Sequence, residues 1–113
     1  MTNDFQLIDG VLSFPPGTAY IRSQQFAGCE DIIKVIIPEG VGFIEDEAFA
    51  ECEALEEVSL PEGLCSIGVA AFASCGSLKR INLPSSLKSI GDGAFLFCIS
   101  LQSIVFPEGL EEI

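Results

Sequence analysis

The chain has 113 residues, which suits a single domain, and 49% of them are hydrophobic, enough to bury a core. Its 17 acidic residues against 5 basic ones give a net charge of -12, which disfavours nucleic acid and anionic membrane surfaces as partners. No apolar run approaches the roughly 18 residues of a membrane-spanning helix, so we expect no membrane insertion.

The N-terminal segment predicts a cap. Residues 1–10 hold no basic residue and no long apolar stretch, so they are not a secretory signal as written. The protein is then cytoplasmic as written, or secreted or surface-bound if a leader or a longer chain is missing. Asp9-Gly10 between two apolar runs is typical of a hairpin. We expect strands at 5–8 and 11–14, within a cap of residues 1–14.

A 23-residue repeat follows the cap. Each register recurs at this interval without an insertion, which is typical of a solenoid whose turns bury their apolar faces against one another. The registers include Pro15, Pro38, Pro61, Pro84 and Pro107; Phe26, Phe49, Phe72 and Phe95; Cys29, Cys52, Cys75 and Cys98; and Ile21, Ile44, Ile67, Ile90 and Ile113.

Within one unit, Leu78, Ile81 and Leu83 form a Leu-x-x-Ile-x-Leu pattern, whose last part alternates with period two and predicts a short strand that Pro84 ends. Leu87 and Ile90 predict a second extended segment, and residues 94–98 have helical or turn-like spacing. The phenylalanines should form one buried column. We expect one domain, 1–113, of about 4.5 repeats over 15–113, the last one incomplete. The missing half repeat indicates either a fragment of a longer array or end-to-end stacking of chains.

The cysteines are expected to be structural. The four at the repeat position should point inward as a stacked ladder of free thiols, because a free Cys is among the most buried residue types. The paired Cys-x-x-Cys spacing of a zinc site is absent. Cys65 is the one candidate for a reactive or intermolecular thiol, because its position points outward.

No catalytic, cofactor or metal site is predicted. The chain has no His, the commonest general base, and no partner that would activate a Ser or Cys nucleophile. One repeat carries an acidic cluster, which is either a solvated face or a group of carboxylates able to do acid–base work or hold Ca²⁺. Its members are Glu45, Asp46, Glu47, Glu51, Glu53, Glu56 and Glu57.

Two exposed rows are candidate protein-binding surfaces. The outward strand residues form the first row, which either serves a partner or offsets nearby acids. They are Lys34, Ile36, Glu57, Ser59, Arg80, Asn82, Ser103 and Val105. In the second row, Tyr20 and Phe43 should be neighbours on adjacent turns. This pair either anchors a partner or packs under the hairpin.

The last full repeat departs from the others. Leu96, Phe97 and Ile99 stand where other units have small, polar or acidic residues. We expect an apolar patch at this end that meets another chain, a missing repeat or a following domain.

The pattern Cys-x-x-Leu-x-x-Ile-x-Leu-Pro-x-x-Leu-x-x-Ile-Gly-x-x-Ala-Phe, from Cys75 to Phe95, resembles the BspA-like class of bacterial leucine-rich repeats. The resemblance implies an α/β-type right-handed solenoid with short parallel strands joined by turns or short helical segments. It also implies a non-enzymatic protein–protein interaction module, in many relatives a surface or secreted recognition protein. The alternative is an intracellular structural or scaffold repeat that self-associates through its ends, in particular the C-terminal one.

Overall fold

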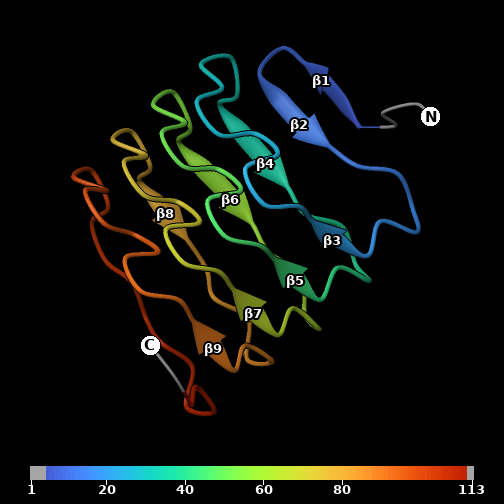
Figure 1. The fold of residues 1–113 in the computed structure, drawn as a ribbon, viewed down its shortest axis with the longest axis vertical. Coiled ribbons are helices and arrows are strands. Elements are labelled where there is room, and N and C mark those ends of the chain that lie inside the picture. The colour runs from blue at the N-terminus through green and yellow to red at the C-terminus, as the bar shows by residue number, and fades with distance from the viewer. Residues whose placement is uncertain (1–4, 112–113) are drawn as a thin grey trace.

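The computed structural model describes residues 5–111, which wind into a solenoid of short strands and turns (Figure 1). No helix is present among these residues, so turns rather than short helical segments join the strands. The strands are β1 (Gln6–Ile8), β2 (Val11–Ser13), β3 (Tyr20–Ile21), β4 (Lys34–Ile36), β5 (Phe43–Ile44), β6 (Glu57–Ser59), β7 (Ser66–Ile67), β8 (Arg80–Ile81) and β9 (Ser89–Ile90).

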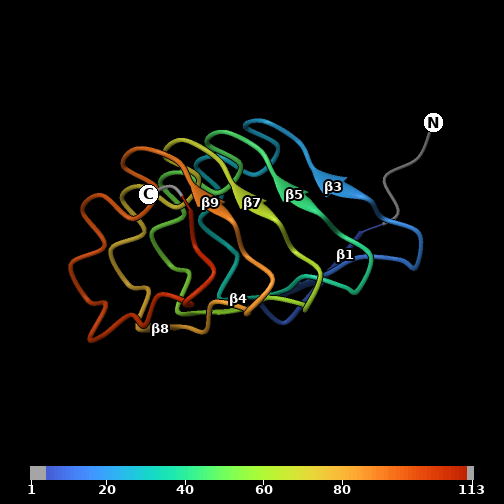
Figure 2. The same ribbon diagram turned by 90° about the horizontal axis from the view of Figure 1, so that it is seen from below.

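Two sheets form opposite sides of the coil (Figure 2). The five-stranded sheet has the order β1-β2-β4-β6-β8, and all its pairs are parallel except β1 with β2. The four-stranded sheet has the order β3-β5-β7-β9 and is parallel throughout. From β4 onward, partners lie 23 residues apart, as in Val35 with Val58. The sequence repeat is therefore the strand register.

Turns form the third side of the coil and are also paired from one turn to the next. The N–H of Phe26 donates to the carbonyl of Ala48 at 2.9 Å, and the N–H of Phe49 donates to that of Ala71 at 2.8 Å. Each turn holds residues in the left-handed region, such as Glu51 with φ of 62°. These bends reverse the chain within a few residues, which leaves no room for a helix.

The phenylalanine column predicted from the period is confirmed. Phe26, Phe49, Phe72 and Phe95 stack in parallel, with ring centroids 5.4, 5.4 and 5.7 Å apart. Phe49 and Phe72 are fully buried. Because Phe49 and Phe72 each pack between the rings of two neighbours, the column ties together turns that are too thin to be stable alone.

The predicted hairpin is confirmed as well. Asp9 and Gly10 both have positive φ, 52° and 83°, as a tight turn between antiparallel strands requires. β2 then forms the first parallel rung of the five-stranded sheet. Phe5 and Phe14 pack edge-on against Phe26, with centroids 5.0 and 5.7 Å from it. The hairpin thus covers the N-terminal end of the aromatic column.

The inward cysteine ladder is confirmed by hydrogen bonds for three of its four predicted members. The thiols of Cys52, Cys75 and Cys98 donate to the carbonyls of Phe26, Phe49 and Phe72 at 3.1–3.2 Å. The described cysteines are all free. Burial is the main cause that raises the pKa of Cys52 and Cys75 to about 12. The thiols are therefore neutral packing groups that also satisfy a backbone acceptor.

The expected strand at Ser103 and Val105 is wrong. The structure gives no strand after β9 within the described residues, although both side chains are exposed as predicted. Next to the four-stranded sheet the last turn keeps a backbone hydrogen bond. The N–H of Glu111 donates to the carbonyl of Lys88, directly before β9, at 2.8 Å. β3, β8 and β9 also have one strand neighbour each and remain strands, so the number of neighbours does not explain the loss.

Candidate functional site

The exposed face of the five-stranded sheet brings together the first predicted row. Lys34, Glu57 and Arg80 are partners in register on β4, β6 and β8, and Ile36 is the partner of Ser59. Side chains alternate along each strand, and Val35, Val58 and Ile81 point into the core. The strand residues on either side of them therefore face outward. The predicted surface therefore exists as a continuous face.

Charges on this face are partly paired. Lys34 lies 3.9 Å from a carboxylate oxygen of Glu57, and Lys79 lies 4.0 Å from one of Glu56. Such exposed ion pairs contribute roughly 0–1 kcal/mol to stability, so they neither fix the face rigidly nor remove its charges from solvent. No ion pair of Arg80 is found within residues 5–111, which leaves its guanidinium open to a partner.

A shallow hollow lies at the C-terminal edge of this face. Asn82, Ser103 and Val105, all predicted from the sequence, line it together with Ile81, Leu83, Ser85 and Pro107, and its volume is about 300 Å³. The hollow lies where β8 lacks a strand partner on this side. The repeat pattern could not indicate it, since a regular array would continue the sheet here.

The four-stranded sheet displays the predicted aromatic pair. Tyr20 and Phe43 are register partners on β3 and β5, with exposures of 48% and 53%. The hairpin pairs with the other sheet, so the alternative that it covers this pair is wrong. A depression of about 310 Å³ beside Phe43 is also lined by Glu45, Asp46 and Ser66.

The acidic cluster has structural contacts. A carboxylate oxygen of Asp46 accepts the N–H of Val69 at 2.8 Å, and one of Glu45 accepts the N–H of Ser23 at 3.1 Å. Each bond bridges two adjacent turns. Within the described part of the chain, no group of three Cys, Asp or Glu side chains is placed to hold a metal ion.

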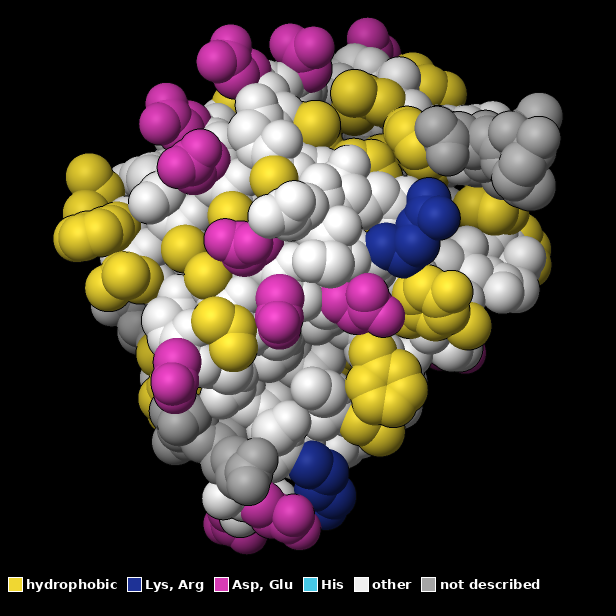
Figure 3. Space-filling model, in the orientation of Figure 1, with side chains coloured by type: hydrophobic (Ala, Val, Ile, Leu, Met, Phe, Trp, Pro, Cys, Tyr) yellow, Lys and Arg dark blue, Asp and Glu magenta, His cyan; other side chains and the backbone are white. Residues whose placement is uncertain are grey.

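The predicted apolar end patch is exposed. Leu96, Phe97 and Ile99 have exposures of 53%, 67% and 83%. In Figure 3 hydrophobic side chains gather at the left edge, over the C-terminal turns, while acidic side chains spread across the face. Phe97 also has a positive φ of 62°, a conformation that strains a bulky residue.

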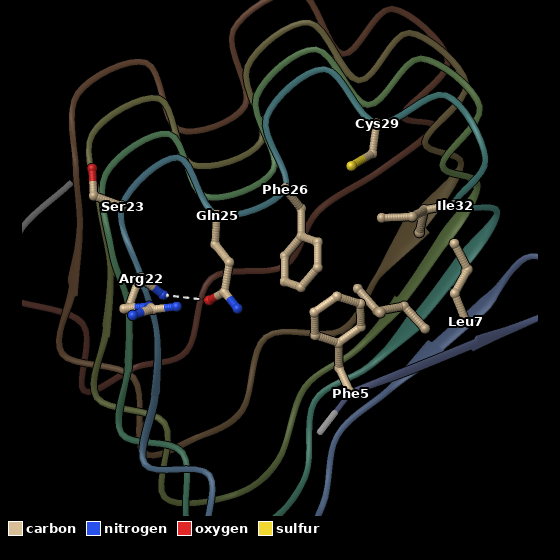
Figure 4. Close-up of a pocket in the computed structure, with 9 residues that line it drawn as sticks. Phe5, Leu7, Arg22, Ser23, Gln25, Phe26, Cys29 and Ile32 are labelled. Atoms are coloured by element: carbon tan, nitrogen blue, oxygen red, sulfur yellow. Dashed lines mark hydrogen bonds between the residues drawn. The ribbon is translucent and has the colours of Figure 1, made fainter. Parts of the chain in front are cut away.

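A hollow of about 580 Å³ at the N-terminal end is a site that sequence reasoning missed (Figure 4). Its lining comes from both the hairpin and the first turn, which have no common spacing in the sequence. The apolar lining is Phe5, Leu7, Leu12, Phe26, Cys29 and Ile32, and the polar lining is Arg22, Ser23 and Gln25.

Solved structures share this fold. A leucine-rich repeat protein from Treponema pallidum is 30% identical, with a TM-score of 0.64 over 87% of this chain and 59% of its own. A leucine-rich cell surface protein from Faecalibacterium prausnitzii is also 30% identical, with a TM-score of 0.60 over 85% of this chain and 31% of its own. The chain therefore spans less than two thirds of either protein.

A leucine-rich repeat protein from Bacteroides capillosus, at 24% identity, matches in fold over 92% of this chain and 94% of its own, with a TM-score of 0.64. No curated protein matches. Over residues 5–111 the structure holds no helix that could cross a membrane. The family model of the BspA-type leucine-rich repeat region matches residues 12–113 in six copies. The chain therefore belongs to the BspA-type leucine-rich repeat family.

Proposed function

We propose that this chain is a non-enzymatic protein-binding module that uses the exposed face of the five-stranded sheet. The family supports the general role, because leucine-rich repeats commonly serve as protein-interaction modules. The observation that carries the proposal is the register of Lys34, Glu57 and Arg80, which aligns three charged side chains across adjacent rungs. A partner lying along the coil would meet all three at once.

The hollow at the edge of the face gives the partner a second type of contact. Arg80 offers a guanidinium, and the hollow lined by Asn82, Ser103 and Val105 offers an amide, a hydroxyl and an apolar wall. Arginine beside apolar contacts is typical of interface anchors. A partner with an acidic group followed by a small apolar side chain fits this arrangement.

A surface or secreted recognition role is the setting we propose. The support is the similarity to the F. prausnitzii cell surface protein, which is 30% identical over 85% of this chain. A recognition role at a surface also agrees with the net charge of -12, which keeps the coil from adhering to anionic lipid.

The test replaces Lys34, Arg80 and Asn82 together by Ser and compares capture of partners with that of the unchanged chain. The matched control replaces Arg22 and Lys88 by Ser, which removes the same positive charge elsewhere. A photo-crosslinking residue in place of Ser59 should attach the partner covalently to the face. If the triple variant and its control capture the same proteins equally, the face is not the binding surface.

Self-association through the C-terminal end is a second candidate function, as in a structural scaffold. The supporting observation is that the last turn exposes both apolar side chains and backbone donors. No acceptor is found within residues 5–111 for the N–H groups of Gly93, Phe95 and Phe97, whereas the equivalent groups of inner turns are all bonded. A second chain could cover this end.

Sedimentation velocity over a concentration series tests this candidate. Phe97→Ser with Ile99→Glu should weaken association, because both changes copy residue types found at the same repeat positions in other turns. Ile36→Ser, an exposed apolar residue on the sheet face, is the control. Self-association would be contradicted if the chain sediments as a monomer at high concentration and the double variant sediments in the same way.

A further inference from the structure

We propose that the N-terminal hollow binds a small apolar monocarboxylate, with the carboxylate at Arg22 and the apolar body on the surface that Phe5, Leu7 and Phe26 line. This site lies outside the sheet face and does not depend on the proposed protein-binding role. Its volume of about 580 Å³ falls within the roughly 300–1,000 Å³ of small-molecule pockets. Three features define the ligand class.

The walls are apolar and held in place. Leu12 and Ile32 are buried in the core and line the hollow. Phe5 projects from the hairpin and Phe26 from the first turn, and their rings meet edge-on with centroids 5.0 Å apart (Figure 4). Because the core fixes these side chains, an apolar ligand finds a preformed surface that includes aromatic rings.

The lining carries a positive charge at Arg22, and the nearby carboxylate of Glu45 is bonded to the backbone N–H of the lining residue Ser23 at 3.1 Å. Arg22 lines the hollow, and none of the nine lining residues is acidic in a chain with 17 acidic residues. Within the part of the chain that the structure describes, Arg22 makes no ion pair, whereas Lys34 and Lys79 each lie beside a glutamate. Its guanidinium can therefore receive a carboxylate through two parallel hydrogen bonds.

Gln25 supplies a second donor beside Arg22. Its side-chain oxygen already accepts the backbone N–H of Arg22 at 3.0 Å, and its side chain extends toward the hollow (Figure 4). The amide nitrogen is then the atom left to donate. Two donors over an apolar floor fit a single carboxylate attached to an apolar body, and they do not fit a cation.

A matched pair of probes tests the charge preference. 4-Phenylbutyrate and 4-phenylbutylamine have the same apolar body and opposite charges. We expect saturable amide shifts in ¹⁵N NMR for the acid, confined to residues 5–14 and 22–32, and weaker binding of the amine. The net charge of -12 favours the amine everywhere else on the surface, so preference for the acid is specific to the hollow. Equal or tighter binding of the amine, or no saturation with the acid, would overturn the proposal.

Arg22→Gln should weaken binding of 4-phenylbutyrate about tenfold, as expected for loss of a charge-assisted hydrogen bond at an exposed rim. Lys88→Gln is the matched control, because it removes the same charge at a position remote in sequence from the hollow and outside its lining. An unchanged affinity in Arg22→Gln would show that the carboxylate is not held at Arg22.

Cys29 gives an independent measurement, because this residue lines the hollow (Figure 4). 4-Phenylbutyrate should slow alkylation of Cys29 by iodoacetamide, measured by peptide mass spectrometry. Cys65, which is exposed and does not line the hollow, serves as the internal reference in the same sample. Slowing of both thiols alike, or of neither, would show that the acid does not occupy the hollow.

Discussion

The rings of Phe49 and Phe72, one repeat apart, lie parallel within 4° with their centroids 5.4 Å apart. Parallel strands in adjacent turns impose this geometry, since equivalent Cα atoms are held one strand spacing apart. Each ring is therefore both a core residue of its own turn and the contact surface of the next. Loss of one ring would affect two interfaces.

Phe49→Ala should lower the free energy of unfolding by about 3–5 kcal/mol, the range for loss of a buried aromatic side chain. Phe95→Ala should have a smaller effect, because Phe95 is half-buried and stacks on one side only, against Phe72. Urea denaturation followed by circular dichroism measures both. Equal losses for the two variants would contradict a column that is stabilised from both sides.

Gly91→Ala should destabilise the fold strongly. A Cβ at this position would lie 2.4 Å from the backbone nitrogen of Val69 and 2.6 Å from the carbonyl carbon of Gly68, so adjacent turns would have to move apart. Gly76→Ala is the matched control, because a Cβ there meets nothing within 4 Å. We expect the control to keep or slightly raise the thermal midpoint. A similar drop in the thermal midpoint of both variants would show that the close approach of adjacent turns is not what requires glycine at position 91.

The thiols should differ widely in reactivity. Cys65 is exposed, whereas Cys52 and Cys75 are buried with their pKa raised to about 12, so few of their thiolates exist at pH 8. Labelling with a disulfide reagent at pH 8 should modify Cys65 first and reach Cys52 and Cys75 only after addition of denaturant. Rapid labelling of all five thiols in the native protein would contradict the buried ladder.

Stability should fall in alkaline solution. The pKa of Cys52 and Cys75 is raised from 9.0 to about 12 in the folded state, chiefly by burial. Between these values the unfolded chain loses thiol protons that the folded chain retains, so the free energy of unfolding decreases as pH rises from 9 toward 12. Below pH 9 this contribution is fully present.

The measurement is the urea midpoint from pH 8 to pH 11. The double variant Cys52→Ala, Cys75→Ala starts from a lower stability, and its midpoint should decline less steeply. The comparison of slopes removes every contribution that the two chains share. Parallel declines would show that the two thiols do not cause the alkaline loss.

The repeated part of the fold could be predicted because one register determines both packing and pairing. The 23-residue step by itself predicts that Phe49 lies under Phe72 and that Tyr20 lies beside Phe43, and both relationships are present. Residues at one repeat position meet equivalent neighbours in every inner turn. For the inner turns the period therefore predicts which residues are in contact.

The same period failed at the ends of the coil. Ser103 and Val105 obey the pattern, but no strand forms there within the described residues. The N-terminal hollow combines Leu7 of the hairpin with Arg22 of the first turn, a contact that no spacing in the sequence indicates. The period predicts contacts between turns that both follow it, and the hairpin does not follow it.

In each inner turn a backbone N–H donates a hydrogen bond to a carbonyl 22 residues later, as from Phe26 to Ala48. This pattern also limits which insertions and deletions in the gene the fold can accept. Duplication or deletion of any 23 consecutive codons between Pro38 and Leu87 would restore every inner donor to an equivalent acceptor. A change of any other length would misalign two sheets and the turns together. The length of this protein can therefore vary readily only in whole coils, which makes unequal recombination a natural route to longer and shorter relatives.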